Sequence, residues 1–262
     1  MTKIIAVCNQ KGGVGKTTTS VNLSASLVTI RKSVLMIDLD PQGNATMGSG
    51  VDKNHLDYSV YDVLSEDVSI SDCIQETRSG YDLLAANGDL TAAEVLLLDS
   101  QRKEYRLKDA ISHVRELYDY IIIDCPPSLN MLTVNALVTA DSVIIPMQCE
   151  YYALEGLAAL IGTIEKIRNV LNPSLYIEGL LRTMFDPRNS LSNDVSKHLL
   201  DQFPEKVFRT IIPRNVRLAE APSHGLPAIL YDKRSRGAVS YLTLAGELIR
   251  RVDREPVMAE TA

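Results

Sequence analysis

The stretch NQKGGVGKTTT, residues 9–19, decides the fold. It follows the apolar run IIAVCN at 4–9 and leads into a segment of helical periodicity at 17–30. Its glycines let backbone N–H groups approach an anion without interference from a Cβ atom. The following helix directs unpaired N–H groups and the positive end of its dipole at the same point. A strand, a glycine-rich loop and a helix in this order predict a phosphate-binding loop.

The loop departs from the usual pattern G-x-x-x-x-G-K-[ST] at its first glycine, because Gln10 holds that position and Lys11 follows it. Lys16 is placed to reach terminal phosphates, and the Thr17 hydroxyl is placed to take one position on Mg²⁺. Thr18 can donate to an inner phosphate. The predicted nucleotide-binding residues of the loop are Lys11, Gly12, Gly13, Val14, Gly15, Lys16, Thr17 and Thr18.

Short apolar runs alternate with helical segments along the chain. Strands are predicted at 4–9, 33–38, 81–86, 120–125, 142–147 and 177–185, and helices at 17–30, 103–117, 129–139, 153–170, 190–202 and 238–252. The strand segments are almost continuously apolar, as strands buried on both faces of a sheet are. The alternation predicts an α/β fold with a doubly wound, mostly parallel sheet and helices on both faces.

We expect a single domain over 1–255 and a flexible tail at 256–262. The polar segment 48–80 is expected to form surface helices and loops of the same domain. Hydrophobic residues make up 45% of the 262 residues and charged residues 23%, which is ordinary for a globular protein. No apolar run approaches the roughly 20 residues of a membrane span, and no secretory segment precedes the first strand. We therefore expect a cytoplasmic protein.

Cysteine and histidine are too scattered to indicate a metal cluster or a disulfide framework. The cysteines are Cys8, Cys73, Cys125 and Cys149. The formal charge of −6 argues against a molecule that is positive all over. Between 179 and 237, however, ten Lys and Arg residues face six Asp and Glu residues. This part of the chain can attract a polyanion although the whole molecule is acidic.

The sequence KGGVGKT at 11–17 resembles the deviant Walker A motif of the ParA/MinD superfamily of ATPases. Nitrogenase iron proteins and arsenical-pump ATPases form other branches of that superfamily. The resemblance implies a P-loop NTPase that uses ATP and Mg²⁺. It also implies that Lys11 reaches across a homodimer to the partner's nucleotide, so that two ATP molecules are sandwiched between two subunits. A solvated surface lysine is the alternative for Lys11.

Two acidic motifs extend the resemblance. DLDPQGNAT at 38–46 begins where the strand at 33–38 ends, at the sheet edge where open α/β folds bind ligands. The spacing of Asp38 and Asp40 places both carboxylates on one side, which suits one near Mg²⁺ and one near an attacking water. The resemblance assigns Asp40 to the water. IIIDCPP at 121–127 ends a strand on Asp124 and resembles a Walker B motif, which holds Mg²⁺ directly or through water.

Two further segments, 148–157 and 211–238, resemble the chromosomal ParA/Soj partition ATPases. That resemblance places Pro213 and Asn215 near the adenine base. It assigns Arg188 and Arg217 to non-specific binding of double-stranded DNA, although a solvated arginine is the alternative for each. It further implies a nucleoid-associated protein that functions in chromosome or plasmid partition. Its slow ATPase would be stimulated by a centromere-binding protein of the ParB/Spo0J type.

Two other functions remain open on sequence grounds. A MinD-like division regulator cycles on membranes through a basic amphipathic C-terminal helix. Here the C-terminal sequence LIRRVDREPVMAETA interrupts such a helix with acids and Pro256, so we expect no stable membrane association. An iron protein would need cluster-bridging cysteines, for which Cys125 is a candidate, although a small apolar thiol beside the Walker B strand is the preferred interpretation of this residue. The first strand begins within a few residues of Met1, so an N-terminal helix-turn-helix, and with it an operator-binding role, is disfavoured.

Overall fold

The computed structural model describes residues 2–65, 67–99 and 101–253. Within these ranges seven strands form one sheet in the order β3-β4-β2-β5-β1-β6-β7. All neighbouring strands are parallel except β3 and β4. The strands are β1 (Lys3–Val7), β2 (Val34–Asp38), β3 (Ile74–Glu76), β4 (Asp82–Leu84), β5 (Tyr120–Asp124), β6 (Ser142–Gln148) and β7 (Tyr176–Thr183). The predicted doubly wound, mostly parallel α/β fold is confirmed.

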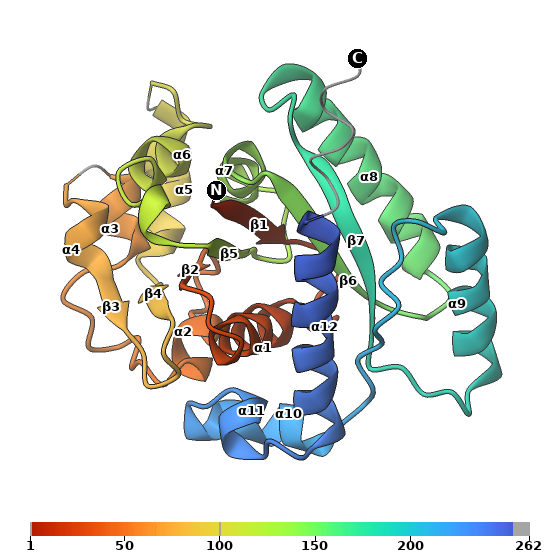
Figure 1. The fold of residues 1–262 in the computed structure, drawn as a ribbon. Coiled ribbons are helices and arrows are strands. Elements are labelled where there is room, and N and C mark those ends of the chain that lie inside the picture. Colours follow the sequence, from red (N-terminus) through yellow and green to blue (C-terminus); the bar gives the residue numbers. More distant parts are fainter. Residues whose placement is uncertain (1, 66, 100, 254–262) are drawn as a thin grey trace.

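Helices cover both faces of this sheet (Figure 1). Among the residues described they are α1 (Lys16–Thr29), α2 (Asn44–Gly48), α3 (Val60–Leu64), α4 (Ile70–Cys73), α5 (Leu90–Asp99), α6 (Arg106–Ile111), α7 (Met131–Thr139), α8 (Ala153–Val170), α9 (Ser190–Gln202), α10 (Val216–Glu220), α11 (Ala228–Tyr231) and α12 (Arg236–Val252). Two short 3-10 helices, η1 (Arg115–Leu117) and η2 (Ala221–His224), complete the set. No helix in the described part of the chain is both long and apolar enough to span a bilayer.

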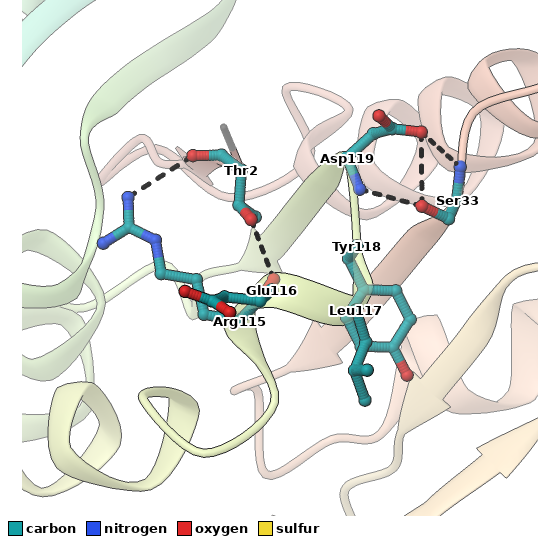
Figure 2. A pocket seen from close by; sticks show the side chains of 7 residues that line it. All are labelled: Thr2, Ser33, Arg115, Glu116, Leu117, Tyr118 and Asp119. Carbon is teal, nitrogen blue, oxygen red and sulfur yellow. Dashed lines mark hydrogen bonds between the residues drawn. The ribbon is translucent and has the colours of Figure 1, made fainter.

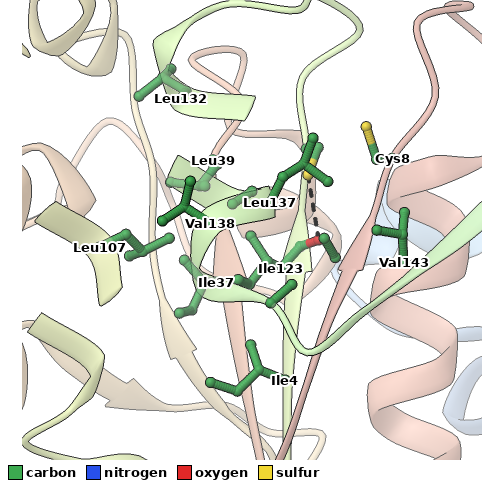
Figure 3. Close-up of a cluster of buried hydrophobic side chains, with 14 of the residues drawn as sticks. Ile4, Cys8, Ile37, Leu39, Leu107, Ile123, Leu132, Leu137, Val138 and Val143 are labelled. Atoms are coloured by element: carbon green, nitrogen blue, oxygen red, sulfur yellow. Dashed lines mark hydrogen bonds between the residues drawn. The ribbon is translucent and has the colours of Figure 1, made fainter. Parts of the chain in front are cut away.

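The sheet has a separate core on each face because successive strand residues point in opposite directions. Ile4 and Ala6 of β1 point into a core shared with α5, α6, α7 and α8. Figure 3 shows part of this core, with Ile4 and Ile37 on the strands and Leu107 on α6. Ile5 points into a second core shared with α1 and α12. Burial on both faces explains why the strand sequences lack polar alternation.

Three local features differ from the sequence-based expectations. The edge strand β3 was not predicted, since its three residues, IQE, are only partly buried and show no periodicity. The predicted helix at 103–117 is wrong as one element, because it divides into α6 and η1. Helices α2, α5, α10 and α11 were not predicted, and all of them except α5 are too short to show a period. The predicted tail at 256–262 lies outside the described residues.

Two glycines fix the loop after α2 against η2. Gly50 and Gly225 have φ angles of 82° and 63°, in the left-handed region that favours glycine. A Cβ atom on Gly50 would lie 2.8 Å from the carbonyl oxygen of Gly225, and one on Gly225 would lie 2.6 Å from the Gly50 Cα. The two backbones are therefore in direct contact, without room for a side chain between them.

Candidate nucleotide-binding site

The carboxyl ends of three adjacent strands meet at one point of the sheet. The register pairs Asp124 of β5 with Val7 of β1 on one side and with Asp38 of β2 on the other. The glycine-rich loop leaves β1 directly after this position and enters α1 at Lys16. The acidic motifs and the loop, which are far apart in the sequence, are thus brought together by strand pairing.

The loop forms an open cradle with its backbone. Gly13 and Gly15 have φ angles of 73° and 89°, which a residue with a side chain adopts only under strain. No atom lies within 4 Å of the position that a Cβ would take on Gly12 or Gly13. The Thr183 hydroxyl donates to the Val14 carbonyl at 2.8 Å and fixes the loop from β7. These features leave the outer side of the loop free to surround an anion.

The two lysines of the loop have different surroundings. Lys16 is buried, and its Nζ donates to the backbone oxygen of Lys11 at 3.2 Å. The Lys11 side chain, by contrast, is 45% exposed and points outward. Its Nζ forms an ion pair of 2.5 Å with Glu150, which follows β6. In the single chain, then, Lys11 is held by a carboxylate of its own subunit.

The two strand-end carboxylates are fully buried and hydrogen-bonded. Asp124 accepts from the hydroxyls of Thr17 and Ser20, both at 2.8 Å. Asp38 accepts from the backbone N–H and the hydroxyl of Thr46, both at 2.8 Å. Across the described part of the chain no lysine or arginine forms an ion pair with either acid. Two buried acids therefore lie next to the phosphate loop with hydroxyl and backbone N–H partners in place of an ion pair.

Burial of these carboxylates favours their protonated forms. Desolvation raises the pKa of Asp38 to about 6, against the effect of the hydrogen bonds from Thr46. Desolvation also raises the pKa of Asp124 to about 7, and the nearby charge of Asp38 acts in the same direction. A bound divalent cation would favour the ionised forms instead. The donor set of Thr17 and Asp124 therefore fits a hard cation such as Mg²⁺, which prefers oxygen ligands and keeps several waters.

Asp40 lies at the edge of a cleft above these acids. It is 9% exposed, and its Oδ1 accepts from the backbone N–H of Gln42 at 3.0 Å. The cleft measures about 540 Å³, and its polar lining includes Asp40 and the loop residues Gly12, Gly13, Gly15, Lys16, Thr17 and Thr18. Its apolar side consists of Val21, Met47, Met184, Pro222 and Leu226. A polar phosphate end and an apolar end in one cleft suit a nucleotide.

Pro213 and Asn215, the residues expected near the base, do not line this cleft. Pro213 forms an isolated bridge with Phe185, just after β7. Asn215 precedes α10, and its Oδ1 is buried without a hydrogen-bond partner. The assignment of these two residues to the base stays a prediction.

Arg188 and Arg217 lie on separate surface segments, and each is paired with carboxylates. Arg188 contacts Asp186 through Nε at 3.0 Å and Nη2 at 2.8 Å. Arg217 contacts Glu220 at 2.7 Å and Asp232 at 3.4 Å. Hydrogen bonds from Arg188 lower the pKa of Asp186 to about 2. Both guanidinium groups stay open to solvent, so a phosphate can compete for them.

A second hollow of about 650 Å³ lies at the opposite, amino-terminal edge of the sheet (Figure 2). The polar groups that line it bond one another. The Thr2 hydroxyl donates to the Arg115 carbonyl at 2.8 Å, and Ser33 donates to Asp119 through its backbone N–H at 2.9 Å. It has no glycine cradle and no pair of buried acids, so it does not match the chemistry of the cleft at Lys16.

Sequence reasoning missed several residues that support the site. Ser20 lies one helical turn after Lys16, so the helix period could have identified it. Thr46 lies eight residues after Asp38 across a turn, and no simple spacing indicates that contact. Gln148 ends β6 and Met184 directly follows the neighbouring strand β7, although the two are far apart in the sequence; Gln148 Nε2 donates to the Met184 sulfur at 2.8 Å. Glu150, the partner of Lys11, lies in the segment 148–157, but the sequence alone indicated no role for it.

The strand-loop-helix unit, the buried acids and the cleft define a P-loop nucleotide-binding protein. A family model described as an AAA domain matches residues 2–177. The sporulation initiation inhibitor protein Soj of Bacillus subtilis is 55% identical over 95% of this chain and 98% of that protein. The chromosome partitioning protein ParA of Myxococcus xanthus is 50% identical over 95% and 88%. The chain belongs to this AAA-domain family and to the ParA/MinD superfamily of ATPases, close to ParA and Soj.

Solved structures agree with this placement. Cobyrinic acid a,c-diamide synthase from Mycobacterium smegmatis, with bound ADP and magnesium, has a TM-score of 0.86. It is 39% identical, and the match covers 97% of this chain and 96% of that chain. The cell division ATPase MinD of Pyrococcus furiosus has a TM-score of 0.80 at 25% identity, with 95% and 99% covered. The expected superfamily is therefore confirmed by both kinds of comparison.

Proposed function

We propose that the protein is a nucleotide-switched partition ATPase that binds ATP with Mg²⁺, dimerises on ATP and then holds DNA without sequence preference. The observation that carries the proposal is the pair of buried, uncompensated acids, Asp38 and Asp124, below an open phosphate cradle. A Mg²⁺-bound triphosphate would supply a cation for the two acids and an anion for the cradle. Magnesium, when bound, neutralises charge on the phosphates.

The residues of the site have separate roles in nucleotide binding and hydrolysis. Loop amides and Lys16 hold the phosphate oxygens and balance the charge that develops on them during transfer. Thr17, Asp38 and Asp124 would hold the ion, directly or through water. Asp40, at the rim of the cleft, orients the attacking water. No side chain attacks phosphorus, so hydrolysis depends on positioning and charge.

Lys11 is assigned to the partner's nucleotide, which makes each site incomplete in a single subunit. Its ion pair with Glu150 has to open before Lys11 can cross to the partner. An exposed ion pair contributes only about 0–1 kcal/mol, so a triphosphate can displace it. An isolated subunit therefore binds ATP but hydrolyses it very slowly.

DNA binding is assigned to the surface that carries Arg188 and Arg217. The excess of basic residues between 179 and 237 supports this assignment. Dimerisation doubles the number of phosphate contacts, and the salt dependence steepens by about −0.9 in logarithmic slope for each phosphate neutralised. A ParB/Spo0J-type protein is the expected stimulator, and nucleoid association follows from DNA binding.

Two alternatives have specific support. The structural likeness to MinD keeps a membrane-cycling role as the second candidate. The likeness to the structure named as a cobyrinic acid a,c-diamide synthase indicates an amide-forming enzyme. Identity to Soj is higher, 55% against 39%, which favours partition. Flotation with anionic vesicles and ATP, and an assay for ATP-dependent amidation, separate these functions.

Retention of DNA in ATP, ADP or no nucleotide, at several salt concentrations, tests the proposal. We expect salt-sensitive retention that requires ATP. Arg217→Glu should lose retention while ATP-driven dimers remain in sedimentation, and Arg168→Glu on α8 is a matched control for the change in charge. Lys11→Ala should remain monomeric with ATP. Equal retention in ADP and ATP would rule out a nucleotide switch.

A further inference from the structure

A pair of aromatic side chains projects into solvent beside the phosphate loop. Tyr151 and Tyr152 directly precede α8 and are 73% and 72% exposed. Their rings meet edge to face, with centroids 5.1 Å apart and an interplanar angle of 87°. Tyrosine is enriched in protein interfaces, where an apolar ring and a polar hydroxyl both find partners. Two exposed tyrosines in contact thus form a strong candidate for an interface anchor.

A small cavity lies next to these tyrosines. It measures about 300 Å³, and Tyr152 and Lys11 both border it. Much of its lining is apolar or small, with Val14 from the loop, Met147 from β6 and Gly156 from α8. At this volume it lies at the lower limit of small-molecule sites. Its size suits an inserted side chain better than a separate ligand.

The Tyr152 ring and the cavity belong to one surface patch, which also contains the positively charged Lys11 and the negatively charged Glu150. Lys11 and Glu150 form their ion pair there, so the patch is not repelled by a copy of itself. In a two-fold symmetric dimer the same patch faces itself, and it must therefore offer both the projecting group and its receptor. This patch meets that requirement, and it adjoins the lysine assigned to the partner's nucleotide.

We propose that Tyr152 of each subunit inserts into the cavity of a second copy of this chain and anchors the ATP-bound dimer, with Tyr151 packed against it. The inference rests on the proposed function, since it concerns the dimer in which Lys11 acts. Insertion covers the loop edge at Lys11, so it excludes water where the two subunits exchange their lysines. Tyr152 acts on association and makes no contact with the nucleotide of its own subunit.

Sedimentation of full-length variants with a slowly hydrolysed ATP analogue and Mg²⁺ tests the anchor. Tyr152→Ser should raise the dimer dissociation constant at least about 10-fold, the effect expected of an interface hot spot. Tyr152→Phe keeps the ring and should retain most of the affinity. Tyr58→Ser changes an exposed tyrosine elsewhere, 45% exposed, and serves as the control. Nucleotide binding by the monomer, measured by equilibrium dialysis, should not change in any of them.

Thiol labelling provides a second measurement. All four native cysteines are buried, so the thiol of Tyr152→Cys is the readily labelled one. At high protein concentration the ATP analogue should slow maleimide labelling of Tyr152→Cys about 10-fold. Labelling of Val170→Cys, at the far end of α8, should not be slowed. Unchanged dimer affinity in Tyr152→Ser, or protection only after a different protein is added, would overturn the inference and leave the proposed function standing. Failure of the native chain to dimerise with ATP would refute the proposed function itself.

Discussion

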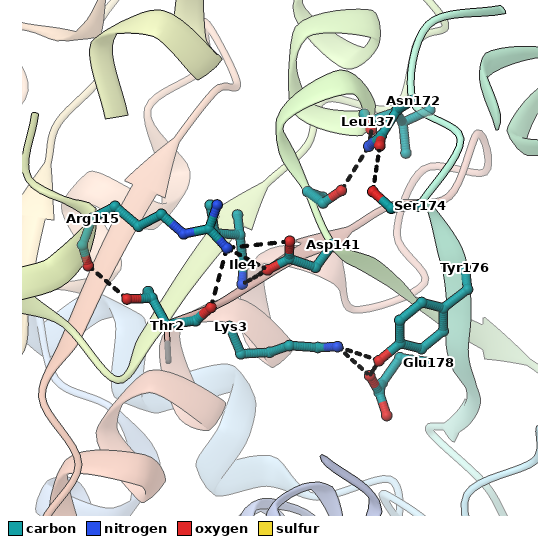
Figure 4. Close-up of polar contacts among 11 residues, drawn as sticks. Thr2, Lys3, Ile4, Arg115, Leu137, Asp141, Asn172, Ser174, Tyr176 and Glu178 are labelled. Atoms are coloured by element: carbon teal, nitrogen blue, oxygen red, sulfur yellow. Dashed lines mark hydrogen bonds and ion pairs between the residues drawn. The ribbon is translucent and has the colours of Figure 1, made fainter. Parts of the chain in front are cut away.

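Acidic side chains at the two edges of the sheet have different partners. At the amino-terminal edge Asp141 and Glu178 each have a cation beside them (Figure 4). Asp141 accepts from the Ile4 backbone at 2.8 Å and pairs with Arg115 at 3.4 Å, and Glu178 lies 3.7 Å from Lys3. At the carboxyl-terminal edge Asp38 and Asp124 have hydroxyl and amide partners only. The first edge joins strands through ion pairs, whereas the second leaves two buried acids without one.

The lysines of the two edges provide the sharpest test. Lys16→Ala removes the cation that the phosphates need, and we expect ATP hydrolysis to fall by about 10²–10³-fold or more. Folding stability should change little, because Lys16 has no ion pair to lose. Measured hydrolysis and nucleotide binding, together with a thermal melt, check both statements. Retained tight ATP binding would remove Lys16 from its assigned role.

Asp124→Asn separates stability from function at the carboxyl-terminal edge. Hydrolysis should fall about 10²-fold because an amide cannot balance Mg²⁺, while the nucleotide-free protein becomes more stable at pH 8 because a buried charge is gone. Activity and melting temperature of the same preparation test this pair of effects. If the variant melted at a lower temperature than the native chain at pH 8, the inference that Asp124 carries a buried charge without a cation partner would be wrong.

Lys3→Ala should have the reverse effect at the amino-terminal edge. It leaves Glu178 buried without its cation, which costs about 3 kcal/mol, at the low end for broken buried pairs because Ser142 and Tyr176 still donate to Glu178. Denaturant unfolding measures the loss. Hydrolysis at a temperature where the variant is folded should match the native chain. Lys3→Ala with Glu178→Gln should recover part of the stability.

The pH dependence of stability provides a further test of the two buried acids. The pKa values of Asp38 and Asp124 are raised to about 6 and about 7, so their protonation stabilises the fold. That contribution is complete below about pH 4 and is lost as pH rises through 6 to 7. The nucleotide-free protein should melt several degrees lower at pH 8 than at pH 5, at about 2–4 °C per kcal/mol. If the melting temperature of Asp124→Asn depended on pH as steeply as that of the native chain, the pH dependence would have to come from other groups.

The sequence predicted the parts of the molecule that depend on local pattern. Apolar runs indicated β1, β2, β5 and β6, and the loop at 9–19 indicated an anion site because glycines, lysine and flanking elements all occur within one short stretch. Asp124 was placed at a strand end correctly, since a buried strand stops where the first charge occurs.

The remaining features depend on contacts between distant segments. The ion pair of Lys11 joins residues 139 positions apart, and Thr183 reaches the loop from 169 positions away. No periodicity encodes such contacts, because they follow from strand order and from the path of each loop. The apolar wall of the cleft also could not be predicted, since Met184 and Leu226 come from different segments and carry no chemical signature.

The paired backbones of Gly50 and Gly225 have a mechanical consequence. Since no side chain separates them, the loop after α2 and the end of η2 meet backbone to backbone. Any residue larger than glycine at either position would push these two segments apart, and it would also have to adopt a left-handed backbone conformation. The spacing between the two segments therefore tolerates no side chain at either position.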